Sequence, residues 1–238
     1  MPVDSKRASG TSFGADGKRY TAAGGAKQIL RYDENGKESI VADSIAGNDL
    51  VVAHNGNIYV TVPDGTSPRG KVYLIRKNGE KMMVEDGLKF PNGVTLSPDQ
   101  TQLYVTESAS HWVWIYRVMP DGTLAYKQRY GWLHVPDTEE NAWPDGLKCD
   151  TAGRVYVATR IGIQIMDQLG RVNAIISIPS IQRTDLIQEM VSPQIDNDCW
   201  KCTCWNPINS FKQNGKQVIP TQGDRNVFGY SYPAYIRK

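Results

Sequence analysis

The sequence predicts an all-β chain folded as a β-propeller of four-stranded antiparallel blades. The main observation is a phrase that occurs four times, in which a short apolar run and a turn lead into a strand centred on a tyrosine. These tyrosines are 39, 45 and 52 residues apart, at Tyr20, Tyr59, Tyr104 and Tyr156. A period of about 40–50 residues built from short strands is typical of propeller blades. The sequence between residues 20 and 180 also has no pattern of a long amphipathic helix.

The second half of each repeat is a strand, a turn ending in glycine, and another strand. Its four copies start at Gln28, Lys71, Trp112 and Gly162. Three of the turns contain Asn35-Gly36, Asn78-Gly79 and Asp121-Gly122, which predict tight hairpins because Asn, Asp and Gly tolerate positive φ. One repeat is therefore four short strands, which is one blade. The expected blades cover residues 8–44, 47–87, 91–132 and 144–179, within a propeller region of residues 1–180.

Two segments depart from the repeat. Residues 133–144 form a polar insert before the fourth blade, and such inserts usually lie at the rim of a propeller channel, where function concentrates. Residues 181–238 are expected to be an irregular C-terminal tail. The tail contains Cys199, Cys202 and Cys204, but no second Cys or His cluster completes a tetrahedral metal set. We interpret these thiols as incidental, with a metal or redox site as the alternative, and Cys149 as a small buried residue in a strand.

Charge and hydropathy limit the classes of partner. The 238 residues include 27 basic and 25 acidic side chains, for a net charge of +2. This balance gives no electrostatic reason to expect a nucleic acid or a membrane surface as partner. No apolar run approaches the ~18 residues that span a bilayer, and the N-terminus lacks a signal-peptide pattern. The default expectation is a cytoplasmic chain that is a monomer or a weak homo-oligomer.

The first residues of the innermost strands suggest a site. Asn48, Asn92 and Asp145 occupy equivalent positions in the second, third and fourth repeats, and Ser9 stands there in the first. Innermost strands line the channel of a propeller, so these residues are expected to converge on its axis. Two amide oxygens and one carboxylate are hard ligands that suit Ca²⁺ or Mg²⁺. Each residue alone also fits ordinary turn chemistry, and only the shared position favours a common site.

Three motifs carry a resemblance to a known family. They are GNDLVV at 47–52, FPNGVTLSPDQTQLYVTE at 90–107 and WPDGLKCDTAGRVYVAT at 143–159. Together they resemble the SMP-30/gluconolactonase/luciferin-regenerating-enzyme-like (LRE-like) family, over about residues 8–180. The resemblance implies a six-bladed propeller that hydrolyses lactones or related esters. It also implies one divalent cation in the channel, with Ca²⁺ expected and Zn²⁺, Mg²⁺ or Mn²⁺ as alternatives.

The resemblance assigns expected roles to individual residues. Asn92 and Asp145 are similar to two direct metal ligands of the family. Asn48 is similar to an asparagine that contacts substrate or metal-bound water, and it is a third candidate ligand. Asp145 also resembles the general base, which would take a proton from a water activated by the ion.

Three further side chains have two interpretations each. His134 in the insert is a candidate substrate contact, with a loop role as the alternative. Arg160, which follows the fourth tyrosine strand, could meet an anionic substrate at the rim or be solvated. Glu107 ends the third tyrosine strand and is expected on a solvated edge, with a place near the channel as the alternative.

The chain also departs from the family pattern. It lacks the glutamate that the family's first blade brings to the metal, and it resembles the middle four blades of a six-bladed member. Loss of a carboxylate ligand weakens cation binding. The leading hypothesis is a metal-dependent, gluconolactonase-like carboxylic-ester hydrolase acting on a small lactone or ester. The alternatives are a non-catalytic propeller binding module and a truncated, inactive fragment. Because the family includes secreted and periplasmic members, the resemblance leaves the cellular location open.

Overall fold

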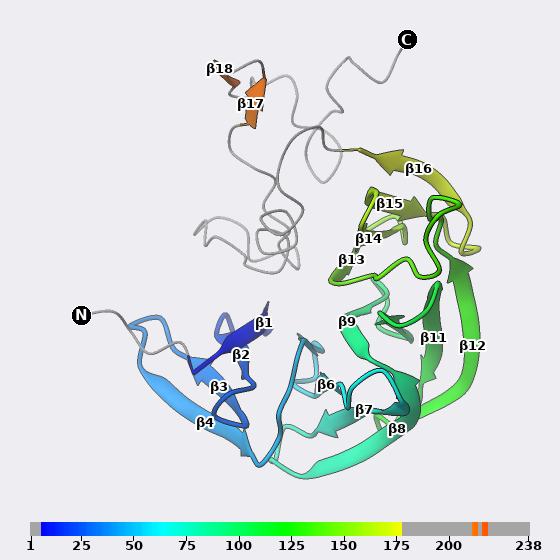
Figure 1. Ribbon diagram of the computed structural model, residues 1–238. Helices are drawn as coiled ribbons and strands as arrows, with labels where there is room; N and C mark the ends of the chain where they lie inside the picture. Colours follow the sequence, from blue (N-terminus) through cyan, green and yellow to red (C-terminus); the bar gives the residue numbers. More distant parts are fainter. Residues whose placement is uncertain (1–5, 178–210, 214–215, 219–238) are drawn as a thin grey trace. The chain divides into compact units, whose positions relative to one another are not determined.

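The computed structural model describes residues 6–177, 211–213 and 216–218, and in these ranges all regular secondary structure is β (Figure 1). The chain divides into two compact units, Met1–Cys204 and Trp205–Lys238. The second unit contains one antiparallel pair, β17 (Phe211–Gln213) with β18 (Lys216–Val218). The three tail cysteines lie outside the described residues. Across the described ranges, no helix has the length and apolar character needed to cross a bilayer.

The first unit contains four sheets, and each has four antiparallel strands in chain order. The first sheet is β1 (Ala8–Phe13), β2 (Arg19–Ala23), β3 (Gln28–Tyr32) and β4 (Glu38–Asp43). The second is β5 (Leu50–Val52), β6 (Ile58–Val62), β7 (Pro68–Ile75) and β8 (Lys81–Lys89). The third is β9 (Pro91–Leu96), β10 (Gln102–Glu107), β11 (Trp112–Val118) and β12 (Leu124–Trp132). The fourth is β13 (Leu147–Cys149), β14 (Val155–Thr159), β15 (Gly162–Met166) and β16 (Val172–Ile176).

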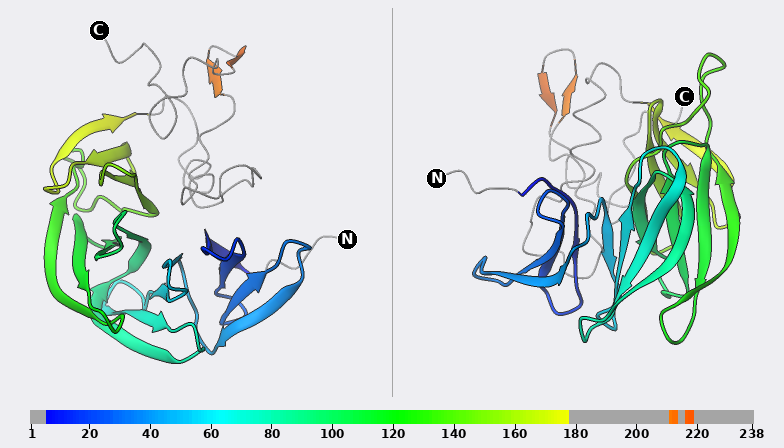
Figure 2. Two further views of the ribbon diagram at one scale, coloured as in Figure 1. Left: turned by 180° about the vertical axis from the view of Figure 1, so that it is seen from behind. Right: turned by 60° about the horizontal axis from the view of Figure 1, so that its bottom comes forward.

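The four sheets of this unit stand side by side as successive blades (Figures 1 and 2). Their first strands are the inner ones, and each contacts the first strand of the next blade: β1 meets β5, β5 meets β9, and β9 meets β13. This arrangement confirms the predicted class, an all-β fold of four-stranded antiparallel propeller blades.

Alternation along each strand explains why the blades stack. Successive side chains of a strand point to opposite faces of the sheet. In β5, Leu50 and Val52 pack against blade one, whereas Val51 between them packs against blade three. Both faces of this strand are therefore buried, and for this reason all three residues of β5 are apolar.

The apolar core accordingly forms three separate clusters, one at each junction between blades. Each cluster draws buried side chains from both blades that meet there. The clusters are centred on Ile29, Leu50 and Val60 for the first junction, Leu74, Val94 and Leu103 for the second, and Val113, Leu147 and Val157 for the third.

Tyrosine hydroxyls add polar ties across two of these junctions. Tyr59, the tyrosine of the second repeat, is buried and donates its hydroxyl to the carbonyl of Gly122 in blade three, at 2.9 Å. Tyr130 in β12 donates to the carbonyl of Asp167 in blade four. The repeated tyrosine of blade two therefore fixes a hairpin turn of its neighbour as well as filling the core.

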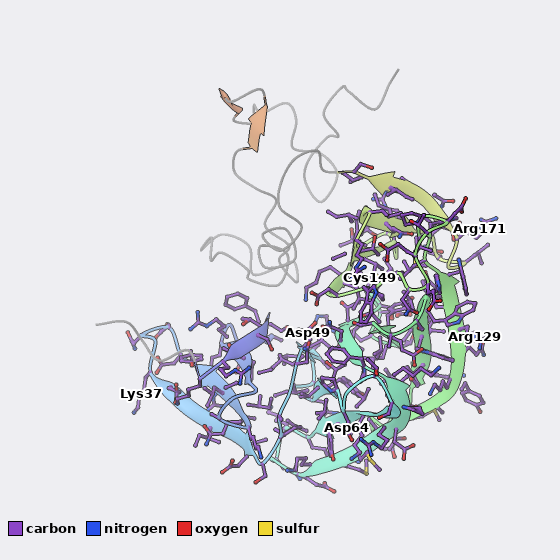
Figure 3. All side chains as sticks on the ribbon, viewed as in Figure 1. Lys37, Asp49, Asp64, Arg129, Cys149 and Arg171 are labelled. Carbon is purple, nitrogen blue, oxygen red and sulfur yellow. The ribbon has the colours of Figure 1, made fainter. Side chains whose placement is uncertain are left out.

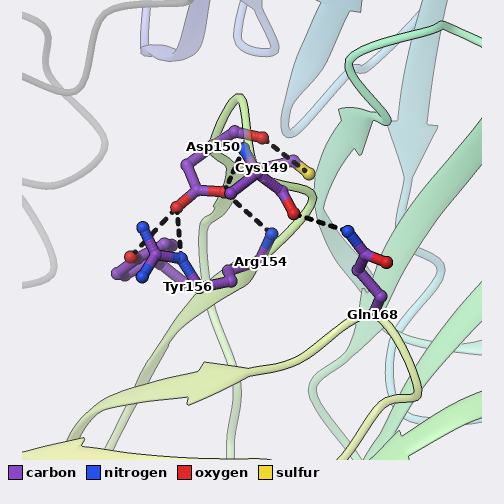
Figure 4. Close-up of polar contacts among 6 residues, drawn as sticks. Cys149, Asp150, Arg154, Tyr156 and Gln168 are labelled. Carbon is purple, nitrogen blue, oxygen red and sulfur yellow. Dashed lines mark hydrogen bonds and ion pairs between the residues drawn. The ribbon is translucent and has the colours of Figure 1, made fainter. Parts of the chain in front are cut away.

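Aspartates shape the hairpin turns, as the Asp150 turn shows (Figure 4). Asp150 Oδ1 accepts the backbone N–H groups of Ala152 and Arg154 at 2.9 and 2.8 Å, and Oδ2 accepts the Arg154 side chain at 2.6 Å. Such Asx turns hold the backbone in a tight reversal. Beside this turn, Cys149 is half-buried in β13, and burial raises the pKa of its thiol to about 12. This thiol is therefore uncharged at neutral pH, as expected of a packing residue.

Two matched turns provide a test of the contact between blades three and four. Gly36 and Gly170 close hairpins of the same type and have φ of 75° and 77°. A Cβ at Gly36 would meet no atom within 4 Å, whereas one at Gly170 would lie 1.8 Å from the carbonyl oxygen of Tyr130. We expect Gly36→Ala to cost about 1–2 kcal/mol for the left-handed backbone alone. Gly170→Ala should cost about 1–3 kcal/mol more, because blade three must shift.

Urea unfolding of the two variants and the parent chain measures this difference. Gly36→Ala is the control for backbone strain. Equal losses of stability in the two variants would contradict a close contact between Tyr130 and Gly170.

Candidate functional site

The three candidate ligands lie at the beginnings of inner strands in three successive blades. Asn48 precedes β5 by two residues, Asn92 is the second residue of β9, and Asp145 precedes β13 by two residues. Backbone hydrogen bonds tie Asn48 and Asp145 to the second strand of their own blade. They run from Asn48 N to Thr61 O at 2.8 Å and from Asp145 N to Ala158 O at 3.0 Å. All three side chains are half-buried.

The structure brings Asn92 and Asp145 together. Asn92 Nδ2 donates to Ser108 Oγ at 3.2 Å, and the Asn92 side chain lies close enough to the Asp145 carboxylate to lower its pKa. The Ser108 contact uses the nitrogen end of the Asn92 amide, which leaves the carbonyl oxygen Oδ1 as the other polar end. One carboxylate and one amide oxygen are thus placed side by side across the junction of blades three and four.

Asn48 is placed through its backbone. Its carbonyl oxygen accepts the Gly10 N–H at 2.8 Å and the Ser9 hydroxyl, both from blade one. Ser9, the residue at the equivalent position of the first repeat, therefore supports the site residue of the next blade. Within the described residues, no hydrogen bond joins the Asn48 side chain to Asn92 or Asp145. Asn48 remains a predicted ligand.

Asp49 also lies at this site, although the repeat pattern does not single it out. It is buried at the inner ends of the sheets (Figure 3). Its Oδ1 accepts the Leu50 N–H at 2.8 Å, and its Oδ2 accepts the Val94 N–H of blade three at 3.1 Å. A carboxylate directly before an apolar strand, where burial is expected, was the available signal. Its two backbone partners make Asp49 a link between blades two and three.

Burial and a neighbouring charge set the protonation of Asp145. Burial raises the pKa of Asp145 to about 6, and the carboxylate of Asp49 adds to the rise. The hydrogen bonds from Asn92 and from the backbone N–H of Gly146 act in the opposite direction. A carboxylate with a pKa near 6 is ionised at neutral pH and remains basic enough to accept a proton in a reaction. Burial also raises the pKa of Asp49, against the lowering effect of Lys148 and the two N–H donors.

Two threonines carry the backbone of the site from blade to blade. Thr61 Oγ1 donates to the carbonyl of Asn92, and Thr106 Oγ1 donates to the carbonyl of Asp145 at 2.7 Å. Both side chains are fully buried, and each lies two residues after the repeated tyrosine. The corresponding residues of blades one and four are Ala22 and Ala158, so the described residues contain this contact only at the two junctions that hold Asn92 and Asp145.

The donor chemistry fits a hard cation. Asp145 offers a carboxylate and Asn92 an amide oxygen, the ligand types that Ca²⁺ and Mg²⁺ prefer. In the described ranges, no group of three or more His, Cys, Asp and Glu side chains is arranged to hold a metal ion. The arrangement therefore suits an oxygen-rich site that completes its shell with water or substrate, and it does not match a zinc-type site of nitrogen and sulfur ligands.

His134 and Arg160 lie around the insert, away from the contacts that join Asn92 and Asp145. Exposed His134 is tied through its backbone N–H and carbonyl to the side chain of Gln164 in β15, at 2.9 and 2.8 Å. It lines an open cavity of about 520 Å³ beside the outermost strand, β16. Arg160 pairs with Glu139 at 2.9 Å and lies over the ring of Trp143 at 5.3 Å. These contacts hold the insert; a substrate role for either residue remains a prediction.

The expectation for Glu107 is wrong. Its side chain is buried, and Oε1 accepts the Lys89 N–H at 2.8 Å. The carboxylate therefore ties the end of β10 to the last residue of β8 in blade two, a contact that depends on the neighbouring blade and has no local sequence signal.

Comparisons with known proteins agree with this architecture. The family model described as "SMP-30/Gluconolactonase/LRE-like region" matches residues 39–187. A gluconolactonase of Zymomonas mobilis is 30% identical over 71% of this chain and 53% of that protein. The pentonolactonase XacC of Haloferax volcanii is 25% identical over 66% of this chain and 54% of that protein. The chain thus spans about half the length of these curated relatives.

A solved structure of a calcium-binding protein, regucalcin from Agrobacterium tumefaciens, has the same fold. It superposes with a TM-score of 0.60 at 18% identity, over 72% of this chain and 60% of that one.

The raised pKa of Asp145 predicts a pH-dependent stability. Its folded pKa of about 6 lies above the ordinary value of 3.8, so the folded state holds this proton more tightly than the unfolded state. The resulting stabilisation is fully present below about pH 4 and is lost as the pH rises through about 6. We expect the free energy of unfolding in EDTA to fall more between pH 4 and 7 for the parent chain than for Asp145→Asn.

Denaturant unfolding at several pH values gives this difference. Other carboxylates contribute to both chains, so only the difference between the two slopes reports on Asp145. Identical slopes would show that Asp145 ionises in the folded chain as it does in the unfolded one.

Proposed function

The chain belongs to the SMP-30/gluconolactonase/LRE-like family, and from this we propose that it hydrolyses a small lactone at a site formed by Asn92 and Asp145. The observation that carries the proposal is a half-buried carboxylate, Asp145, whose pKa is raised to about 6 by burial and which has the Asn92 amide beside it. The two curated relatives are named for lactones, one of a hexose acid and one of a pentose acid. A sugar lactone is therefore the substrate class to examine first.

The site residues suggest how such a reaction would proceed. Asp145, ionised at neutral pH, accepts a proton from a water molecule as the water oxygen bonds to the lactone carbonyl carbon. The ring C–O bond then breaks, the departing ring oxygen takes up a proton, and the product is the open hydroxy acid. Asn92 and the Thr106 hydroxyl hold Asp145 in position for this proton transfer. Asn48, His134 and Arg160 are the proposed substrate contacts.

We also propose that the site takes one divalent cation, with Ca²⁺ first. Asn92 Oδ1 and the Asp145 carboxylate would hold it, with Asn48 as a third oxygen donor. When bound, such an ion would polarise the lactone carbonyl and lower the pKa of a coordinated water. The name of the Agrobacterium protein, a calcium-binding protein, is in keeping with this choice, but the proposal depends on the oxygen donors of this chain.

A second candidate function is a propeller binding module without catalysis. Both carboxylate oxygens of Asp49 are engaged by backbone N–H groups, which leaves Asp145 as the charged candidate ligand. Cation affinity falls as the number of charged ligands falls. A chain that binds the cation or a sugar acid but does not turn over a lactone would support this second function.

Cation binding is tested first by thermal unfolding. Calcium should raise the melting temperature of the EDTA-treated parent chain. At a hundred times Kd, binding stabilises the folded state by about 2.7 kcal/mol. Asp145→Asn should abolish the rise, because it removes the charged ligand. Asp64→Asn is the matched control, since it removes the same charge at an exposed position in the connection between β6 and β7. A rise in the Asp145→Asn chain equal to that in the parent would remove Asp145 from the cation site.

Turnover is tested separately with gluconolactone and pentonolactones. Hydrolysis releases an acid, so a pH indicator follows the reaction after subtraction of the spontaneous rate. Asp145→Asn should lower kcat by about 10²–10⁴-fold, the usual contribution of a general base. Asp64→Asn should keep the parent rate. Calcium binding without any lactone turnover would favour the binding module.

A further inference from the structure

Ser108 connects the two central residues of the site, although nothing in the sequence pattern singled it out. It follows β10 directly and is 4% exposed. Its hydroxyl donates to the carbonyl of Pro144, the residue before Asp145. The same oxygen accepts Nδ2 of Asn92 at 3.2 Å, and the Ser108 N–H donates to the carbonyl of Phe90 at 3.0 Å. Ser108 thus lies between the beginning of β9 and the segment that leads into β13.

The Pro144 contact determines which way the Ser108 hydroxyl points. A serine hydroxyl has one proton, and here the carbonyl of Pro144 takes it. Towards Asn92 the hydroxyl oxygen can then act only as an acceptor, so it selects the NH₂ end of the amide. Rotation of the amide by 180° would place Oδ1 against this oxygen, with one acceptor facing another.

Thr106 strengthens the same arrangement from two residues away. Its hydroxyl accepts the N–H of Gly93, which follows Asn92, at 2.8 Å, and donates to the carbonyl of Asp145 at 2.7 Å. Together, Thr106 and Ser108 bond to two consecutive carbonyls, those of Pro144 and Asp145. The backbone of both central residues is therefore fixed, and the amide torsion of Asn92 is the remaining freedom, which Ser108 controls.

We propose that Ser108 is a positioning residue that orients the Asn92 amide so that Oδ1 faces the ligand of the site. The orientation is a property of the ligand-free chain, whereas the identity of the ligand, a divalent cation, rests on the proposed function. A partner that orients a metal ligand typically contributes 10–100-fold to metal affinity.

The orientation is tested by NMR of the ¹⁵N-labelled chain in EDTA. The side-chain NH₂ signals of Asn92 are assigned by their loss in Asn92→Asp. We expect Ser108→Ala to shift these signals and to speed their exchange with water, and Ser108→Thr to restore the parent positions because it keeps the hydroxyl. Ser110→Ala is the matched control, since Ser110 donates to the Glu107 carbonyl in the adjacent turn. Unchanged Asn92 signals in Ser108→Ala would overturn the proposal.

A folding failure of Ser108→Ala would not block the test. Ser108→Cys has nearly the parent volume, and its thiol is only a weak hydrogen-bonding group, so it should shift the Asn92 signals in the same way. Backbone amide spectra of every variant verify that the blades are folded.

Calcium titration of the same samples separates this proposal from the proposed function. We expect Ser108→Ala to weaken calcium binding by about 10–100-fold and Ser108→Thr to recover most of it. Equal calcium affinity in the parent and Ser108→Ala would overturn the positioning role. If the parent chain binds no calcium but Ser108→Ala still shifts the Asn92 signals, the orienting role of Ser108 is supported and the proposed cation site is contradicted.

Discussion

The structure depends on apolar packing between neighbouring blades, through which the two middle blades bury both of their faces. A four-stranded antiparallel sheet with one apolar face can leave the other face in water, but here Leu50 and Val51, adjacent in β5, are both buried in different clusters. A blade with such a sequence is not stable alone in water. Its apolar area leaves water only when the neighbouring blades are present, which is why the core consists of junctions between blades rather than of blade interiors.

The same dependence places the candidate site residues between blades. Asn92 belongs to blade three and Asp145 to blade four, while Asp49 reaches from blade two to the backbone of blade three. Hydroxyls of Thr61, Thr106 and Ser108 then fix the carbonyls beside the candidate ligands. Buried polar groups of this kind must be satisfied by specific partners, so they define one register between neighbouring blades where apolar packing alone would tolerate several.

The repeat made the fold predictable, and it also located Asn92 and Asp145, because equivalent positions in successive blades must lie near one another. The partners of these residues were harder to predict from the sequence. Asp49, Glu107 and Ser108 acquire their roles from backbone groups of another blade or of a distant segment, and such groups leave no mark in the residues around them. The repeat pattern does not single out Asp49, and Glu107 was assigned to water because local sequence favours that interpretation. His134 is a candidate because its insert precedes Asp145, and Arg160 because it could meet an anionic substrate at the rim. Their contacts in the structure are with β15 and with the insert.

The residue two positions after the repeated tyrosine divides the four blades into two kinds, with threonine in blades two and three and alanine in blades one and four. Thr61 and Thr106 reach forward to the next blade, whereas Ala22 and Ala158 have no hydroxyl to do so. The blades share strands, turns and tyrosines, but they are not interchangeable modules. A shuffled chain with blade one in the place of blade two would retain the propeller pattern and lose the support of Asn92. The order of the blades therefore matters as well as their sequences. A change in the order of the repeats would remove contacts at the candidate site while the propeller fold remained.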